Sequence, residues 1–352
     1  MAYRFKISET PQHAVRRLGC EQIDRAMRAL TAAELSGGAV HETRKCLKRI
    51  RALLRLVRPG LTGEDFQREN SRFREIGRLL SPARDAQILT ETLLKLEPYA
   101  DPAANAALAV LKQHIGAAMP AAGVQPNSAT IATAREHLLE GRASIAKLTV
   151  TGTNFGAVES GLMDGYRKGL ELFERTYRSG TDETFHEWRK CVQLHWRHMA
   201  LLLRAWPDML TARVEAARQL SQILGEAQDL AVLLHHIDTL PPGTLAKADQ
   251  TRLVRLARKR QTHLRALAEP RGAQLFSLSP KALARSVMES WHAARALDDL
   301  TDKKLAATAA PKPPADEESS APHVSATGPH PGFPAVPQKA RAAKRKRTKS
   351  PA

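Results

Sequence analysis

Two nearly identical six-residue segments hold the residue types best suited to chemistry in this sequence. The first, HETRKC, begins at His41, and the second, HEWRKC, begins at His186, 145 residues later. Histidine, cysteine and basic side chains in one short segment could hold a metal ion, activate a nucleophile or bind an anion. The residues around the two segments distinguish these three chemistries.

Metal binding and catalysis receive little support. The helical zinc pattern His-Glu-x-x-His is not completed, because Lys45 and Lys190 stand where the second histidine would be. On a helix His41 and Cys46 would point about 140° apart, and the neighbouring basic side chains oppose a cation. The sequence has no Gly-rich phosphate loop, nucleophile elbow or repeated acidic cluster. It therefore predicts no metal site, no cofactor and no catalytic residues.

Anion binding is favoured by the residues that follow the first segment. No Asp or Glu occurs from Arg44 through Gly63. Within this segment, basic residues three or four positions apart form a helical stripe about 20 Å long, made up of Arg44, Lys48, Arg51, Arg55 and Arg58. Like charges at this spacing destabilise an isolated helix. An extended polyanion is the simplest partner, and the alternative is a solvated face, which usually mixes both signs.

The second segment predicts a related but less basic helix. His186, Lys190, Arg197 and Arg204 fall on one face with Arg189 beside them, whereas Gln193 replaces Lys48 and Trp196 replaces Arg51. If the two helices pack about a pseudo-twofold axis, both stripes could line one basic cleft. Neighbouring helices could add further basic residues to it, namely Arg72, Arg84, Arg167, Lys168, Arg255 and Lys259.

The elements that must position these residues are helices. Helical periodicity and prolines at the boundaries predict helices at 10–34, 40–58, 63–96, 103–118, 128–147, 156–178, 183–204, 208–240, 246–268 and 279–296. A second pair of segments, RLLSPARDAQILTETL from Arg78 and QILGEAQDLAVLLHHI from Gln222, repeats at an offset of 144. The sequence thus predicts an all-α fold with duplicated halves at about 10–147 and 156–297.

Composition indicates the compartment and the class of partner. The 352 residues carry a formal charge of +18, which favours a polyanionic partner. Three scattered cysteines favour a reducing compartment, and the absence of a signal peptide or a long apolar window predicts a cytoplasmic protein without membrane contact. Residues 301–352 hold nine of the 21 prolines and end in KARAAKRKRTKS. We expect this segment to be a disordered basic tail after a domain at 1–300.

The two segments with their surroundings, HETRKCLKRIRALLRLVRP and FHEWRKCVQLHWRHMALLLRAWP, resemble the signature helices of the CHAD family, the conserved histidine α-helical domain. LLSPARDAQIL and ILGEAQDLAVL are similar to the segments that follow those helices. The resemblance spans about 10–297 and implies two four-helix-bundle-like halves around a basic cavity that binds inorganic polyphosphate, with association to polyphosphate granules. By position, it implies these binding residues: His41, Arg44, Lys45, Lys48, Arg49, Arg51, Arg55, His186, Arg189, Lys190 and Arg197.

Two other functions are compatible with the sequence. A nucleic-acid or nucleoid-associated protein is suggested by the basic tail, which would contact any DNA duplex without sequence preference. However, aromatic residues make up only 5% of the chain, whereas proteins that grip single strands interleave aromatic and basic residues. A helical adaptor that regulates a polyphosphate enzyme is the third reading, and it predicts an exposed apolar patch.

Overall fold

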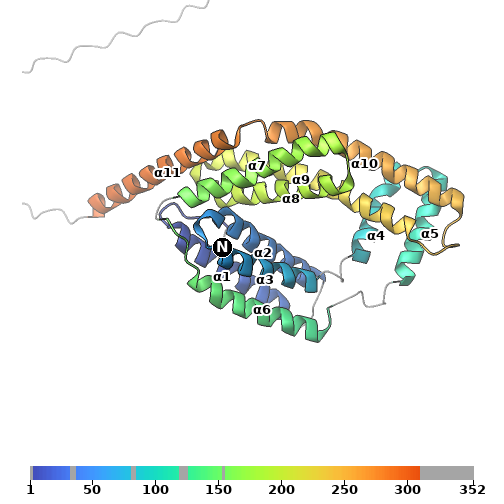
Figure 1. The fold of residues 1–352 in the computed structure, drawn as a ribbon, viewed down its shortest axis with the longest axis horizontal. Helices are drawn as coiled ribbons and strands as arrows, with labels where there is room; N and C mark the ends of the chain where they lie inside the picture. The colour runs from blue at the N-terminus through green and yellow to red at the C-terminus, as the bar shows by residue number, and fades with distance from the viewer. Residues whose placement is uncertain (1–2, 32–36, 81–84, 119–125, 153–154, 310–352) are drawn as a thin grey trace, which may run out of the picture. The chain divides into compact units, whose positions relative to one another are not determined.

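The structure, a computed structural model, describes residues 3–31, 37–80, 85–118, 126–152 and 155–309. All regular structure in these segments is helical, which confirms the all-α prediction. Figure 1 shows the helices in chain order, and their bounds are α1 Pro11–Thr31, α2 Gly37–Leu56, α3 Gly63–Leu79, α4 Asp85–Leu96, α5 Pro102–Ala118, α6 Ser128–Lys147, α7 Gly156–Ser179, α8 Asp182–Leu201, α9 Pro207–Asp238, α10 Lys247–Leu275 and α11 Pro280–Ala309. Short 3₁₀ turns follow three of them, at Arg58–Gly60, Glu97–Tyr99 and Leu203–Ala205.

The larger hydrophobic core joins helices from both ends of the chain. α1 packs against α2 and α6, α3 packs against α2 and α6, and α8 packs against α7 and α9. The apolar positions of these helices recur every three or four residues, so each helix buries one stripe. Phe73, Leu138, Trp188 and Trp291 lie fully buried in this one connected cluster.

A second core forms where α4 and α5 meet α9 and α10, as seen at the right of Figure 1. Leu93 and Leu111 from the first two helices pack in one cluster with Leu233 and Leu253 from the last two. All four side chains are at most 1% exposed. Residues 85–118 therefore pack with helices from the second half of the chain. The predicted halves, 10–147 and 156–297, would instead place them with the other helices of the first half.

Three helix boundaries differ from the sequence prediction. The single helix predicted at 63–96 is two helices, α3 and α4. α10 continues through Pro270, where a stop was expected, and it buries Gly272 and Leu275 beyond the proline. This packing stabilises a helical turn that the proline, lacking an N–H, weakens. α11 extends to Ala309, beyond the predicted end at 296. Residues 310–352, most of the expected tail, lie outside the described part of the chain.

A row of glycines on α7 lets the end of α2 approach closely. A Cβ atom built on Gly161 would lie 1.9 Å from the carbonyl oxygen of Leu56 and 3.1 Å from that of Arg55. On the same side of α7, Gly165 faces the ring of His198 and Gly169 faces the ring of Phe276. The backbones of α2 and α7 are thus in direct contact, and this contact fixes the helix that carries the first basic stripe.

Candidate basic site on α2 and α3

The first signature helix, α2, separates its apolar and basic residues as the sequence predicts. Leu47, Ile50, Leu53 and Leu54 are at most 2% exposed and belong to the large core. On the other sides of the helix, His41, Lys45 and Lys48 are exposed, and Arg44, Arg49, Arg51 and Arg55 are half-buried. Arg58 lies beyond the end of α2, in the 3₁₀ turn.

Two arginines of α3 join this helix to form a wider basic surface. Burial, reinforced by the charges of Arg55, Arg74 and Arg78, lowers the pKa of Arg51 to about 10. The Nε of Arg51 donates to Asn70 Oδ1 at 3.2 Å, so its contact on α3 is uncharged. We refer to Lys48, Arg51, Arg55, Arg74 and Arg78 as the α2–α3 basic face. Its guanidinium groups repel one another, which an anion bound across them would relieve.

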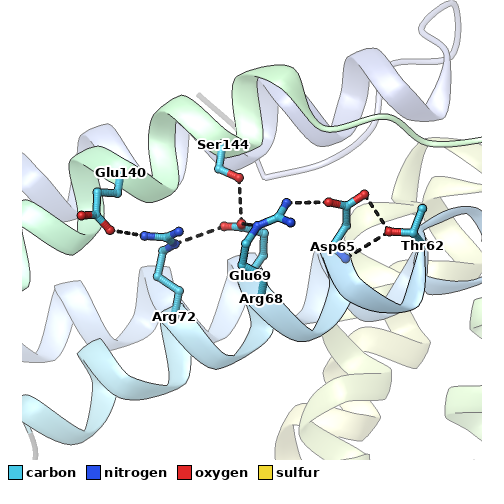
Figure 2. Close-up of polar contacts among 7 residues, drawn as sticks. All are labelled: Thr62, Asp65, Arg68, Glu69, Arg72, Glu140 and Ser144. Carbon is cyan, nitrogen blue, oxygen red and sulfur yellow. Dashed lines mark hydrogen bonds and ion pairs between the residues drawn. The ribbon is translucent and has the colours of Figure 1, made fainter.

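Two acidic residues of α3, Asp65 and Glu69, are engaged away from this face, Asp65 with Arg68 and Glu69 on the side toward α6. Figure 2 shows the network: Glu69, fully buried, contacts Arg68 Nε at 2.9 Å and Arg72 Nε at 3.4 Å, and it accepts a hydrogen bond from Ser144 of α6 at 2.7 Å. Arg72 also pairs with Glu140. Arg72, considered above as an addition to the basic cleft, therefore ties α3 to α6.

The remaining predicted residues of α2 diverge toward different neighbours. Arg44 Nη1 donates to the carbonyl of Gly77 on α3 at 2.7 Å, and Lys45 lies 3.6 Å from Glu42. Arg49 turns toward α1 and donates to Gln22 Oε1 at 3.1 Å. Burial, with the nearby charge of Arg58, lowers the pKa of Arg55, which lies within electrostatic range of Cys191 on α8. The basic residues of α2 thus interact with three different neighbouring helices, α1, α3 and α8.

The second signature helix, α8, is far less open. Arg197 is 8% exposed, and burial, together with the charges of Arg49 and Arg189, lowers its pKa to about 10. Lys190 pairs with Glu187 at 2.5 Å, and the side chain of Arg189 lies against Gly225 of α9. Burial and the charge of Lys190 hold the pKa of His186 below its ordinary value. The residues that the sequence placed on one basic face are therefore divided between the interior and the surface.

Direct contacts join α2 to α8. His198 Nε2 donates to the carbonyl oxygen of Ala52 at 3.1 Å, and both residues are buried. Cys46 and Cys191, from the two hexapeptides, are also buried, and burial raises the pKa of each to about 11. The described residues contain no group of three or more His, Cys, Asp or Glu side chains that could hold a metal ion.

Two cavities of the structure lie away from α2 and α8, the helices on which the sequence suggested a shared basic cleft. One is lined by residues of α4, α9 and α10, including Lys95, Asp229 and Arg260, and the other by Ser279, Lys281, Arg285 and their neighbours at the start of α11. Neither includes a residue of α2 or α8. Of the α2–α3 basic face, Lys48, Arg74 and Arg78 are exposed, whereas Arg51 and Arg55 are half-buried.

Two buried histidines of α8, His195 and His198, make stability depend on pH. Burial and the charges of Arg55 and Arg197 lower the pKa of His198 to about 3, and burial with Arg213 lowers that of His195 well below its ordinary value. The unfolded chain takes up these protons near pH 6.5, well before the folded protein does. Stability should therefore fall as pH decreases below about 6.5, by up to about 1.4 kcal/mol per pH unit for each histidine.

Urea unfolding at about pH 7 and about pH 5 would measure this dependence. His198→Gln, which keeps an N–H donor for the Ala52 carbonyl but cannot titrate, should reduce it. An identical urea midpoint at both pH values in the wild-type protein would contradict the prediction.

Comparisons with known proteins agree on the fold. The family model described as CHAD domain matches residues 21–238. A solved structure, PptA from Streptomyces chartreusis, superposes with a TM-score of 0.56 at 14% sequence identity, and the match covers 77% of this chain and 100% of that one. No curated protein matches the chain. In the described segments, no helix is both long and apolar enough to span a membrane.

Proposed function

The chain belongs to the CHAD family, and from this premise we propose that it binds inorganic polyphosphate, without catalysis, on the α2–α3 basic face. The observation that carries the proposal is the cluster of Arg51, Arg55, Arg74 and Arg78, in which the last three lie close enough for their charges to lower the pKa of Arg51, while the buried acid of α3, Glu69, is paired with Arg68 and Arg72. Such a cluster is unfavourable for folding alone, and a polyanion would offset the repulsion.

Polyphosphate suits this face for chemical reasons. Each internal phosphate carries about one negative charge at neutral pH, and guanidinium groups bind phosphate oxygens through paired, charge-assisted hydrogen bonds. Polyphosphate has no nucleobases that would stack on aromatic side chains. The α2–α3 basic face accordingly consists only of Lys and Arg. We further propose that α2 and α8 derive from duplicated halves and that the protein acts in the cytoplasm, at polyphosphate granules.

A nucleic-acid partner is the second candidate, favoured by the basic run KARAAKRKRTKS, which lies outside the described residues. Both polyanions would bind through release of counterions and would weaken as salt rises. Competition at about 150 mM salt separates them. The protein, bound to labelled long-chain polyphosphate, is titrated with duplex DNA at matched phosphate concentration. Retention of polyphosphate supports the proposal, and displacement at equal phosphate concentration favours nucleic acid.

A further inference from the structure

Arg49 on α2 and Arg197 on α8 share an unusual arrangement of hydrogen bonds. Arg49 donates Nη1 to the side-chain oxygen of Gln22 at 3.1 Å, and Arg197 donates Nη1 to the carbonyl oxygen of Gln193 at 2.6 Å. Both acceptors are uncharged. Within the described segments, neither arginine forms an ion pair, and the edge made by Nε and Nη2 has no hydrogen-bond acceptor on either one. Through this edge an arginine can bind a phosphate with two parallel hydrogen bonds.

Burial makes the arrangement costly for the protein alone. Arg197 is more than nine-tenths buried, and its Nε is shielded from solvent without an acceptor in the described residues. A buried guanidinium that lacks a counter-charge is strongly unfavourable. The charge of Arg49 acts on Arg197 and adds to the repulsion. An anion held by both arginines would satisfy their open edges and neutralise their charge.

The N-terminal residues hold the two arginines together. The guanidinium carbon of Arg49 lies 5.4 Å from the centroid of the Tyr3 ring, and the Tyr3 hydroxyl donates to the Arg49 carbonyl. Tyr3 also lies within electrostatic range of Arg197. Phe5, fully buried, donates its N–H to the carbonyl of Leu201 on α8 at 2.8 Å, which fixes this segment. Tyr3 thus positions Arg49 beside Arg197.

We infer that Arg49 and Arg197 bind the terminal phosphate of a polyphosphate chain, an inference that rests on the proposed function. A chain end can reach a buried guanidinium, whereas an internal phosphate continues in both directions and needs an open surface such as the α2–α3 basic face. A terminal phosphate also has a second ionisation near pH 6, so at neutral pH it carries more charge than an internal one. Two arginines match a group with this extra charge.

The test compares free and blocked chain ends. Full-length protein is titrated with polyphosphate of one narrow length class, either unmodified or with both ends blocked as phosphoramidates. The wild-type protein should bind unmodified chains about ten- to hundredfold more tightly, as expected for lost hydrogen bonds to charged groups. Arg197→Met and Arg49→Lys should bind both probes equally, at the wild-type affinity for blocked chains. Arg175→Gln, which removes one exposed charge from α7, should keep the preference.

Each outcome has a distinct meaning. Equal wild-type affinity for free and blocked chains would overturn the inference but leave polyphosphate binding intact. Failure of the wild-type protein to bind either probe would overturn the proposed function itself. Circular dichroism measures whether each variant is folded. If Arg197→Met is not folded, Arg49→Lys alone tests the inference, because lysine keeps the positive charge but not the planar guanidinium group.

Discussion

Replacing Arg51, Arg74 and Arg78 together by glutamate is expected to lower the affinity for polyphosphate by at least about a thousandfold. The change removes three cations from the α2–α3 basic face and places three negative charges opposite the phosphates. Each lost charge-assisted hydrogen bond accounts for about 1.5–3 kcal/mol, and repulsion adds to this loss. Titration with long-chain polyphosphate at constant salt measures the effect.

The same triple variant should remain folded. Arg74 and Arg78 are exposed, and Arg51 loses one hydrogen bond to Asn70 while its repulsion with Arg55 ends. The helical circular dichroism should therefore be unchanged. The matched control replaces Arg255, Arg258 and Lys259 by glutamate, which alters the net charge equally on the exposed side of α10. If that control lost as much affinity, the α2–α3 basic face would not be the site that governs binding.

Gly161→Ala is expected to destabilise the protein by more than about 4 kcal/mol, enough to unfold many domains of this size. The added methyl would lie 1.9 Å from the Leu56 carbonyl oxygen and 2.7 Å from its carbon. Both are backbone atoms of α2, so no side-chain rotation relieves the clash. The helices α2 and α7 would have to separate, which opens the packed core between them. The midpoint of urea unfolding measures the loss.

Gly116→Ala is the control for this substitution. Gly116 lies within α5, where an added Cβ meets no atom within 4 Å, so alanine should stabilise the helix by up to about 1 kcal/mol. Opposite shifts of the two urea midpoints are therefore expected. A Gly161→Ala variant that unfolds at the wild-type midpoint would show that the contact with α7 does not fix α2.

Features that depend on one helix at a time could be predicted from the sequence. The apolar side of α2 and the basic residues around it follow from spacing alone, because helical periodicity decides which residues face the core. The same reasoning correctly predicted that the regular structure of the described residues is helical. Pro59, which follows the last residue of α2 by three positions, is likewise a local stop signal, since proline lacks the N–H that would continue the helix.

Features that depend on how helices pack could not be predicted. Arg74 and Arg78 are four residues apart on α3, but nothing local indicates that this side of α3 meets Arg51. Arg197 occupies a position that spacing alone assigned to a basic face, yet α8 turns it inward, where Tyr3 and Trp196 lie close to it. The packing of α4 and α5 on α9 and α10 joins residues more than 100 positions apart in sequence, a pairing set by tertiary contacts.

The most direct measurement is a crystal structure of the full chain with a polyphosphate of defined length. The account predicts a continuous chain of phosphates along α2 and α3, with oxygen atoms within hydrogen-bond distance of Arg51, Arg74 and Arg78. Phosphates bound instead across the basic residues of α10, with the α2–α3 basic face left uncovered, would contradict it.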